Sequence, residues 1–314
     1  MMVKRKKNLP ICCPCCKEDL IRKDYGYTCS NKNCDHSKVN NAFPVFNEIP
    51  ILISETQTDT VCSIEVGKTY ISRPNTKYKN LKKLIVGESA VTKSNCLIFL
   101  DLILQKSKNP KVLVVGGGER GSGTENLWNT KGIDIDSFDI YASETTDFVC
   151  DAHYMPIKSN SYDGVWIQAV LEHVVEPNKV VAEIYRVLKC EGIVYAETPF
   201  MQQVHEGAYD FNRYTVLGHR YLFKNFELID LGGNKGPELV LAWALRYFIW
   251  ALTRSRRIAQ IIGLFFNFIM RPFSLLLSKK SMYDASSGVY FLGRKKVYHR
   301  TSHKDLISLY KGQF

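Results

Sequence analysis

Residues 112–121 read Val112-Leu113-Val114-Val115-Gly116-Gly117-Gly118-Glu119-Arg120-Gly121. The four apolar residues predict a buried strand, and the glycines predict a tight turn at which backbone can approach a ligand. Polar residues at 122–125 then lead into a helix. A strand, a glycine-rich turn and a helix in this order are typical of a nucleotide-binding α/β protein. The spacing of Gly116, Gly118 and Gly121 alone suits a nicotinamide or flavin enzyme equally well.

Apolar runs alternate with helical periodicity on both sides of this turn. Helices are predicted over 95–105 and 178–188, where apolar residues recur at helical intervals. Strands are predicted over 112–115, 137–142, 147–150, 164–168, 192–197, 226–231 and 288–294. This alternation predicts a doubly wound α/β fold with a parallel sheet. Asp139 belongs to the second strand, where a carboxylate would accept hydrogen bonds from ribose hydroxyls.

An ordered series of short motifs follows the second strand. It comprises Asp151-Ala152, Met155-Pro156, Ser161 to Val165, Val170 to Val174, Pro177, Glu183-Ile184, Arg186 to Leu188 and Glu191-Gly192. The series resembles the class I S-adenosylmethionine-dependent methyltransferases of the ubiquinone and menaquinone type, over residues 110–200. The resemblance implies methyltransferase activity on a Rossmann-like seven-stranded sheet. In that fold the sixth strand is parallel and the seventh returns antiparallel.

The same resemblance implies a binding site for S-adenosylmethionine. The implied residues are Gly116, Gly118 and Gly121 around the methionine part, Asp139 at the ribose, Asp151 and Ala152 at the adenine, and Gln168 beside the sulfonium. Val114 departs from the family, which usually has an acidic residue there, and the third glycine falls one position late. These departures leave a non-catalytic binding protein of the same fold as one alternative.

A segment rich in polar and aromatic side chains, residues 198–215, follows the fifth predicted strand. Loops at the carboxyl ends of parallel strands face the ligand, so this segment is expected to meet the methyl acceptor. It resembles the H-x4-D-[FY]-x-R-[FY]-T segment of bacterial methyltransferases associated with surface-glycan synthesis. The expected catalytic residues are His205 and Asp210, either of which can accept a hydroxyl proton, and the expected substrate-binding residues are His205, Asp210, Arg213 and Tyr214.

Two assignments near the acceptor keep a structural alternative. Arg213 can bind a substrate phosphate or carboxylate, or it can form an ion pair with Asp210 that pins the loop. Glu172 and His173 follow the fourth predicted strand. We interpret both as structural residues of a strand-to-helix corner in preference to catalytic bases.

Six of the ten cysteines lie within residues 12–34. Two pairs of thiolates at such spacing can surround one tetrahedral zinc ion. The predicted zinc ligands are Cys13, Cys16, Cys29 and Cys34, with His36 as a weaker substitute and Cys12 and Cys15 as bystanders. The segment resembles the small zinc ribbons that activate or precede certain methyltransferases. A closed site of four thiolates has no open position, so the zinc is expected to be structural.

The formal net charge of +11 is unevenly distributed. Counting Lys and Arg against Asp and Glu gives +8 for residues 1–110, −7 for 111–235 and +10 for 236–314. Basic flanks suit an anionic partner such as a phospholipid surface, a nucleic acid or a phosphate-bearing substrate. The basic N-terminus lacks the apolar stretch of a secretory signal, which predicts a cytoplasmic location.

Two apolar helical stretches are predicted at 239–252 and 258–277, separated by three arginines. The first is too short to span a bilayer, and the second is interrupted by polar residues and Pro272. Aromatic apolar faces next to basic residues suit an anionic membrane surface. Residues 238–280 are therefore predicted to dock on the inner face of the membrane, near the mouth of the active site. Packing on the core or on a second subunit is the alternative.

These observations divide the chain into five parts. They are a zinc-ribbon module (1–60), a lead-in helical segment (61–110), a cofactor-binding core (111–235), an apolar helical insertion (236–287) and the last strand with a tail (288–314). The predicted function is methylation of a small or lipid-linked acceptor, such as a hydroxyl of a surface glycan or its precursor. The second possibility is an RNA methyltransferase, which is disfavoured because the basic stretches contain few interleaved aromatic residues.

Overall fold

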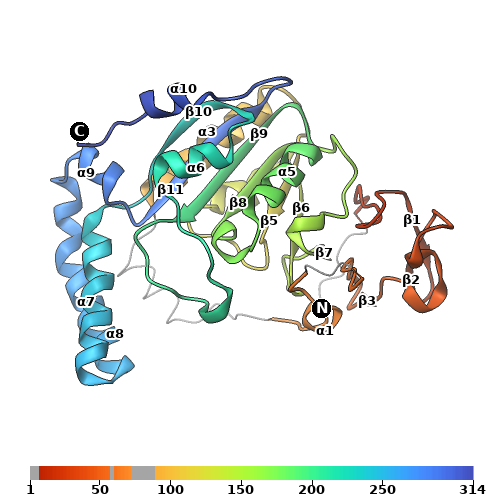
Figure 1. Ribbon diagram of the computed structural model, residues 1–314, viewed down its shortest axis with the longest axis horizontal. Helices are drawn as coiled ribbons and strands as arrows, with labels where there is room; N and C mark the ends of the chain where they lie inside the picture. The colour runs from red at the N-terminus through yellow and green to blue at the C-terminus, as the bar shows by residue number, and fades with distance from the viewer. Residues whose placement is uncertain (1–6, 57–59, 72–88, 314) are drawn as a thin grey trace.

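A seven-stranded sheet forms the centre of the computed structural model, which describes residues 7–56, 60–71 and 89–313 (Figure 1). Its strands are β5 (Lys111–Val115), β6 (Asp134–Asp139), β7 (Phe148–Val149), β8 (Tyr162–Gln168), β9 (Leu188–Pro199), β10 (Phe226–Gly233) and β11 (Gly288–Lys295). Their order is β10-β11-β9-β8-β5-β6-β7. Strands β5 to β9 pair in parallel, whereas β11 is antiparallel to both of its neighbours. The predicted seven-stranded Rossmann-like sheet is thus confirmed.

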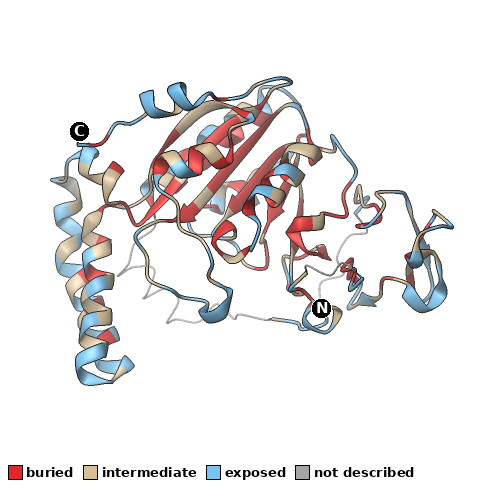
Figure 2. Cartoon of the chain, in the orientation of Figure 1, coloured by how far each residue is buried: buried red, intermediate tan, exposed pale blue. Residues whose placement is uncertain are grey.

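Helices cover both faces of the sheet, because its strands bury apolar side chains on both sides. On one face, α3 (Ala90–Leu104) and α4 (Glu125–Asn129) pack on a cluster that includes Val112, Trp166 and Tyr195. On the other face, α5 (Pro177–Val187) and α6 (Val216–Leu222) pack on the larger core. Figure 2 shows the central strands almost wholly buried between these layers.

The second strand differs from its predicted range of 137–142. It begins earlier because Lys111 Nζ binds the carboxylates of Asp134 (3.1 Å) and Asp136 (2.9 Å), so that charged residues are tolerated in a strand. It ends at Asp139, whose Oδ1 accepts the N–H of Ile140 (2.7 Å) as the chain turns. This earlier end places the carboxylate of Asp139 at the carboxyl edge of the sheet, beside the glycine turn.

The N-terminal module covers the β7 edge of the sheet. It contains two small hairpins, β1 (Leu20–Lys23) with β2 (Gly26–Cys29) and β3 (Val45–Phe46) with β4 (Ile49–Pro50). After β4 the chain follows β7, and the N–H of Leu52 donates to Val149 O (2.8 Å). Lys17 Nζ also binds Glu183 Oε2 on α5 (3.1 Å). The module therefore shields backbone groups that a free edge strand would expose.

Helices α7 (Pro237–Thr253) and α8 (Arg256–Met270) form a hairpin that extends away from the sheet (Figure 1). The hairpin lies between β10 and β11 in the sequence, as predicted for the insertion. Helix α8 is shorter than the predicted 258–277 because Pro272 lacks a backbone N–H, and the chain continues as a 3-10 turn. The remaining described helices are α1 (Ile64–Gly67), α9 (Lys279–Asp284) and α10 (His303–Ser308).

The hairpin is the least buried part of the main fold (Figure 2). Only Leu239, Ala242, Ala259, Gly263 and Asn267 are buried among its described residues. Within the part of the chain that the structure describes, no helix combines the length and the apolar composition that crossing a bilayer requires.

Candidate functional site

The glycine turn after β5 needs glycine for physical reasons. Gly116 has a φ of +71°, and a Cβ there would clash with Val170 Cγ2. The N–H of Gly118 donates to Asp139 Oδ2 (2.8 Å), and a Cβ at Gly118 would lie 2.6 Å from that same oxygen. The turn therefore lies tightly against the end of β6, and its backbone borders the place where a nucleotide would bind.

Gln168 closes the same site from the end of β8. Gly121 packs on it so closely that a Cβ would clash with Gln168 Oε1. Gln168 Nε2 donates to Ser122 O (3.2 Å). A cavity of about 40 Å³ lies between Gly116, Gly121, Trp166 and Gln168. The structure thus brings Gly116, Gly118, Gly121, Asp139 and Gln168 together at the carboxyl edge of the sheet.

Asp151 and Ala152 lie at the start of a 3-10 turn after β7 (Ala152–Tyr154). Asp151 Oδ1 accepts the N–H of His153 (2.9 Å), and Oδ2 accepts the hydroxyl of Thr60 (2.6 Å). Burial alone would raise the pKa of Asp151, but the hydrogen bonds from His153 and Thr60 outweigh burial and lower it. Both oxygens of Asp151 therefore accept hydrogen bonds from within the chain.

Glu197 is a carboxylate that sequence reasoning did not assign to the site. It lies near the end of β9, where its Oε2 accepts the hydroxyls of Thr92 (2.8 Å) and Tyr195 (2.8 Å). Asn234 donates to Oε1, and Gln168 Nε2 lies 3.5 Å from it. Burial raises the pKa of Glu197. Its position at the end of the fifth strand, next to Gln168 on the fourth, is the signal that could have identified it.

The predicted acceptor segment is organised around Asp210. Both guanidinium NH2 groups of Arg213 bind its carboxylate, with Nη2 at 2.7 Å from Oδ2, and Arg213 Nε donates to Gln202 O (3.0 Å). The ion pair given as the structural alternative for Arg213 is therefore present. The guanidinium group of Arg213 is thus bound within the loop, which does not favour the expected role of Arg213 in substrate binding.

His205 is oriented by the same carboxylate. Its backbone N–H donates to Asp210 Oδ2 (2.9 Å), and its ring Nδ1 lies 3.2 Å from that oxygen. Hydrogen bonding to Arg213 lowers the pKa of Asp210 to about 2, so Asp210 is a poor proton acceptor. Burial lowers the pKa of His205, which keeps the imidazole neutral near pH 7. Of the two expected catalytic residues, His205 is better suited to accept a proton, and Asp210 to orient it.

Glu172 and His173 lie directly beside His205. They belong to the 3-10 turn after β8 (Leu171–His173), and the rings of His173 and His205 are 4.9 Å apart. The Glu172 side chain is fully buried, and among the described residues neither carboxylate oxygen has a hydrogen-bond partner. Burial raises the pKa of Glu172 to about 8. A corner residue that served packing alone would not leave a buried carboxylate without partners.

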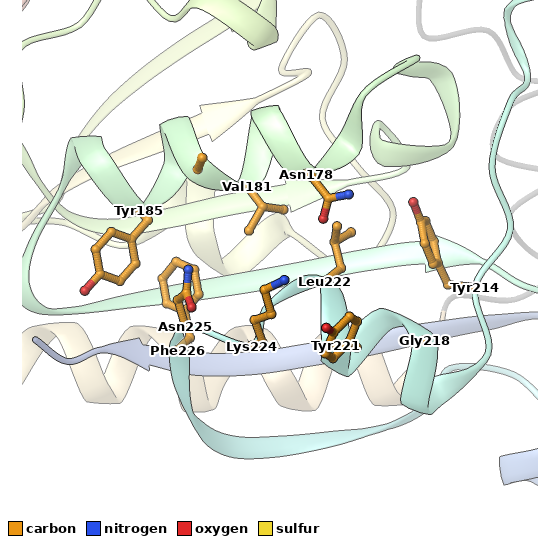
Figure 3. Close-up of a pocket in the computed structure, with 11 residues that line it drawn as sticks. Asn178, Val181, Tyr185, Tyr214, Gly218, Tyr221, Leu222, Lys224, Asn225 and Phe226 are labelled. Atoms are coloured by element: carbon orange, nitrogen blue, oxygen red, sulfur yellow. The ribbon is translucent and has the colours of Figure 1, made fainter. Parts of the chain in front are cut away.

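Tyr214, an expected substrate-binding residue, lies apart from this cluster. It lines an open groove of about 420 Å³ between α5 and α6, shown in Figure 3. Tyr185, Tyr221 and Phe226 line the same groove. The lining contains none of the glycine-turn residues, so the groove is separate from the site at the carboxyl edge.

Four cysteines of the N-terminal module converge, as the predicted zinc site requires. The sulfur atoms of Cys13, Cys16, Cys29 and Cys34 lie within 4.8 Å of one another, and those of Cys16 and Cys29 are 3.3 Å apart. Zinc–sulfur bonds of about 2.3 Å in a tetrahedron place sulfurs about 3.8 Å apart.

The other candidate ligands of this module have different partners. Cys12 is buried, and its N–H donates to Pro156 O (2.9 Å), whereas Cys15 Sγ donates to Ser54 Oγ (3.2 Å). His36 Nδ1 forms a hydrogen bond with Asn41 O (2.7 Å), and His36 Nε2 forms one with Ser54 Oγ (2.7 Å). Both ring nitrogens of His36 are thus engaged, so His36 does not act as a substitute ligand in this arrangement.

Asp139→Ala is expected to weaken binding of S-adenosylmethionine by about 1–3 kcal/mol. The ribose hydroxyls of the bound cofactor would lose their hydrogen bonds to the charged Asp139 carboxylate. Titration calorimetry measures the change. Asp134→Ala is the matched control, since Asp134 occupies the opposite end of β6 and binds Lys111. If the two variants bind S-adenosylmethionine with equal affinity, Asp139 does not contact the ribose.

Comparison with known proteins is consistent with this geometry. Residues 113–196 match the family described as a methyltransferase domain. No curated protein sequence matches the chain. Three solved structures show the range of its distant similarities.

Phosphoethanolamine N-methyltransferase 2 from Haemonchus contortus, with phosphomonomethylethanolamine and S-adenosylhomocysteine, is similar over 72% of this chain and 59% of its own (16% identity, TM-score 0.40). Geranyl diphosphate C-methyltransferase from Streptomyces coelicolor A3(2) is similar over 64% and 75% (12% identity, TM-score 0.40). The [4+2]-cyclase SpnF is similar over 75% and 89% (16% identity, TM-score 0.39). The domain match, the strand order and the glycine turn together show that this chain contains a class I S-adenosylmethionine-dependent methyltransferase domain.

Proposed function

We propose that the enzyme methylates a hydroxyl of an acceptor held at a membrane surface, such as a lipid-linked glycan precursor. One observation carries this proposal. The apolar, basic hairpin of α7 and α8 contacts the acceptor segment, because the Tyr247 hydroxyl donates to Val204 O (2.8 Å). Val204 immediately precedes His205, so a surface that docks the hairpin would lie near the acceptor side of the site.

The chemistry needs little from the protein beyond alignment and removal of a proton. S-adenosylmethionine supplies an electrophilic methyl group on a sulfonium. The acceptor oxygen forms a bond to the methyl carbon while the carbon–sulfur bond breaks, and that electron pair returns to sulfur. The hydroxyl proton passes to the neutral imidazole of His205, which lies beside the Asp210 carboxylate.

The hairpin presents an apolar surface without a partner among the described residues. Its most exposed large side chains include Phe248 (59%), Leu252 (65%), Phe265 (65%) and Phe268 (62%). Large apolar side chains exposed together on one hairpin favour an interaction site.

The charge of the hairpin favours anionic lipid over a second copy of this basic chain. Residues 237–270 contain four arginines, no lysine and one acidic residue, Glu238. Arg254, Arg256 and Arg257 are exposed at the tip, where α7 meets α8. Each basic residue near an anionic bilayer contributes about 1 kcal/mol of attraction, whereas two such hairpins would repel each other.

We also propose that the four converging cysteines hold one structural zinc ion. The geometry of their sulfur atoms supports this assignment. Cys13 and Cys29 belong to the same apolar cluster as the core of the sheet. The ion would therefore stabilise the contact between the module and β7 as well as the module itself.

The acceptor is expected to be found in membrane lipid. Radiolabelled S-adenosylmethionine is incubated with the enzyme and separate lipid, soluble glycan and RNA fractions, and label should enter the organic phase of the lipid reaction. His205→Ala should lower the rate by about a hundredfold or more, and the exposed neighbour variant Glu206→Gln should retain it. Label confined to RNA would replace this proposal with the nucleic-acid alternative.

Binding to vesicles tests the hairpin separately. The protein should sediment with phosphatidylcholine vesicles that contain phosphatidylglycerol, less so at high salt, and should stay in solution without lipid. The double variant Phe265→Ser with Phe268→Ser should lower the partition coefficient by at least about tenfold. Each change removes apolar surface that the bilayer would otherwise bury. The control pair Tyr298→Ser with Ile307→Ser removes exposed apolar residues elsewhere and should bind normally. Membrane docking is wrong if both pairs bind equally.

One zinc ion per chain is expected by metal analysis of the purified protein. Cys13→Ser and Cys29→Ser should each lose zinc, because an alcohol replaces a thiolate ligand. Cys15→Ser should keep zinc, since Cys15 lies in the same knuckle but contacts Ser54. Full zinc content in the first two variants would disprove the ligand assignment.

A further inference from the structure

Glu172, His173 and His205 converge on one point beside the acceptor segment. One ligand-type atom from each, a carboxylate oxygen or a ring nitrogen, lies within 4.8 Å of the others. Glu172 and His173 come from the turn after β8, and His205 comes from the loop after β9. The N–H groups of Phe211 (2.7 Å) and Asn212 (3.2 Å) donate to the backbone carbonyl of Glu172, which joins the two segments.

One ring nitrogen of each histidine lies beside an acceptor. His173 Nδ1 lies 2.7 Å from Tyr209 O, and His205 Nδ1 lies 3.2 Å from Asp210 Oδ2. Because a carbonyl oxygen only accepts, the first contact assigns the Nδ1–H tautomer to neutral His173, which leaves its Nε2 with a lone pair. His173 Nε2 lies 3.6 Å from Glu172 Oε1. Histidines that bind metals are usually oriented by such an outer hydrogen bond to a carbonyl or a carboxylate.

The carboxyl group of Glu172 has no hydrogen-bond partner among the described residues that would offset its burial. Its side chain is 1% exposed, and both oxygens lack hydrogen-bond partners among the described residues. The nearby Arg213 is bound to Asp210 through both terminal nitrogens. Because a buried carboxyl group without hydrogen bonds is unfavourable even when it is neutral, a cation bound by the ionised carboxylate would account for the arrangement.

We propose that Glu172, His173 and His205 bind a divalent metal ion at the acceptor side of the site. Metal–ligand bonds of about 2.0–2.2 Å separate two ligand atoms by about 3–4.4 Å, so small rotations of these side chains complete the set. Two imidazoles and one carboxylate suit a first-row transition ion such as Mn²⁺, Fe²⁺, Co²⁺ or Zn²⁺ better than Mg²⁺, which prefers oxygen ligands. Three protein ligands leave positions open for a substrate.

The role of the ion in catalysis rests on the proposed transfer to a hydroxyl, but its binding does not. A bound divalent ion lowers the pKa of a hydroxyl that it contacts. The hydroxyl proton would then leave to solvent water, and the oxygen would keep the electron pair that forms the bond to the methyl carbon. In that case His205 serves as a ligand, and no side chain has to accept the proton.

Metal titration of the zinc-loaded full chain tests the site. Mn²⁺ binding is followed by electron paramagnetic resonance, and Co²⁺ binding by absorption in a parallel sample. One ion per chain should bind in addition to zinc. Glu172→Gln and His205→Ala should each weaken binding by about tenfold or more, as for loss of a ligand or its support. Glu206→Gln makes the same chemical change at an exposed neighbour and should bind as the unaltered chain does.

Two controls separate loss of the metal site from misfolding of a variant and from an error in the proposed acceptor. Calorimetric binding of S-adenosylmethionine to each variant reports whether its core is intact, and metal binding is measured without acceptor or lipid. The site is disproved if the unaltered chain binds neither ion at millimolar concentration, or if Glu172→Gln and His205→Ala bind as tightly as Glu206→Gln. Saturable binding lost in both ligand variants supports the site even if the acceptor later proves not to be lipid-linked.

Discussion

Parallel pairing of β5 with β6 and β8 is the constraint on which the site depends. The register places Val115 beside Phe138 on one side and Ile167 on the other. The next residues along these three strands are Gly116, Asp139 and Gln168. Parallel strands all end at the same edge of the sheet. The strand register alone therefore brings together the turn at Gly116, the carboxylate of Asp139 and the amide of Gln168. The apolar clusters on both faces hold this register in place.

The acceptor side is held by a second set of interactions, which are polar. Arg213 and Asp210 fix the loop after β9, and the carbonyl of Glu172 accepts two N–H groups from that loop. The same contacts orient His205. A bidentate ion pair between two partly buried side chains is directional, so it can position an imidazole on a segment that has little regular secondary structure.

Both attachments to the methyltransferase domain lie at edges of the sheet. The cysteine module covers β7 at one edge, and the hairpin enters between β10 and β11 at the other (Figure 1). The module buries apolar residues against the core, whereas the hairpin leaves its large apolar residues exposed. This difference in burial is why we propose a structural role for the first attachment and an interaction role for the second.

Local patterns in the chain were sufficient for the presence and order of the strands, the glycine turn and the clustering of the cysteines, because each depends on residues near one another in the sequence. The tertiary structure alone paired Asp151 with Thr60, joined Glu197 to Thr92 and Asn234, and showed that the carboxyl oxygens of Glu172 are buried without a hydrogen bond from any described residue. These features join residues from separate segments. The ionic and hydrogen-bonded state of a side chain depends on those distant neighbours, so it appears only when the strands and loops are packed together.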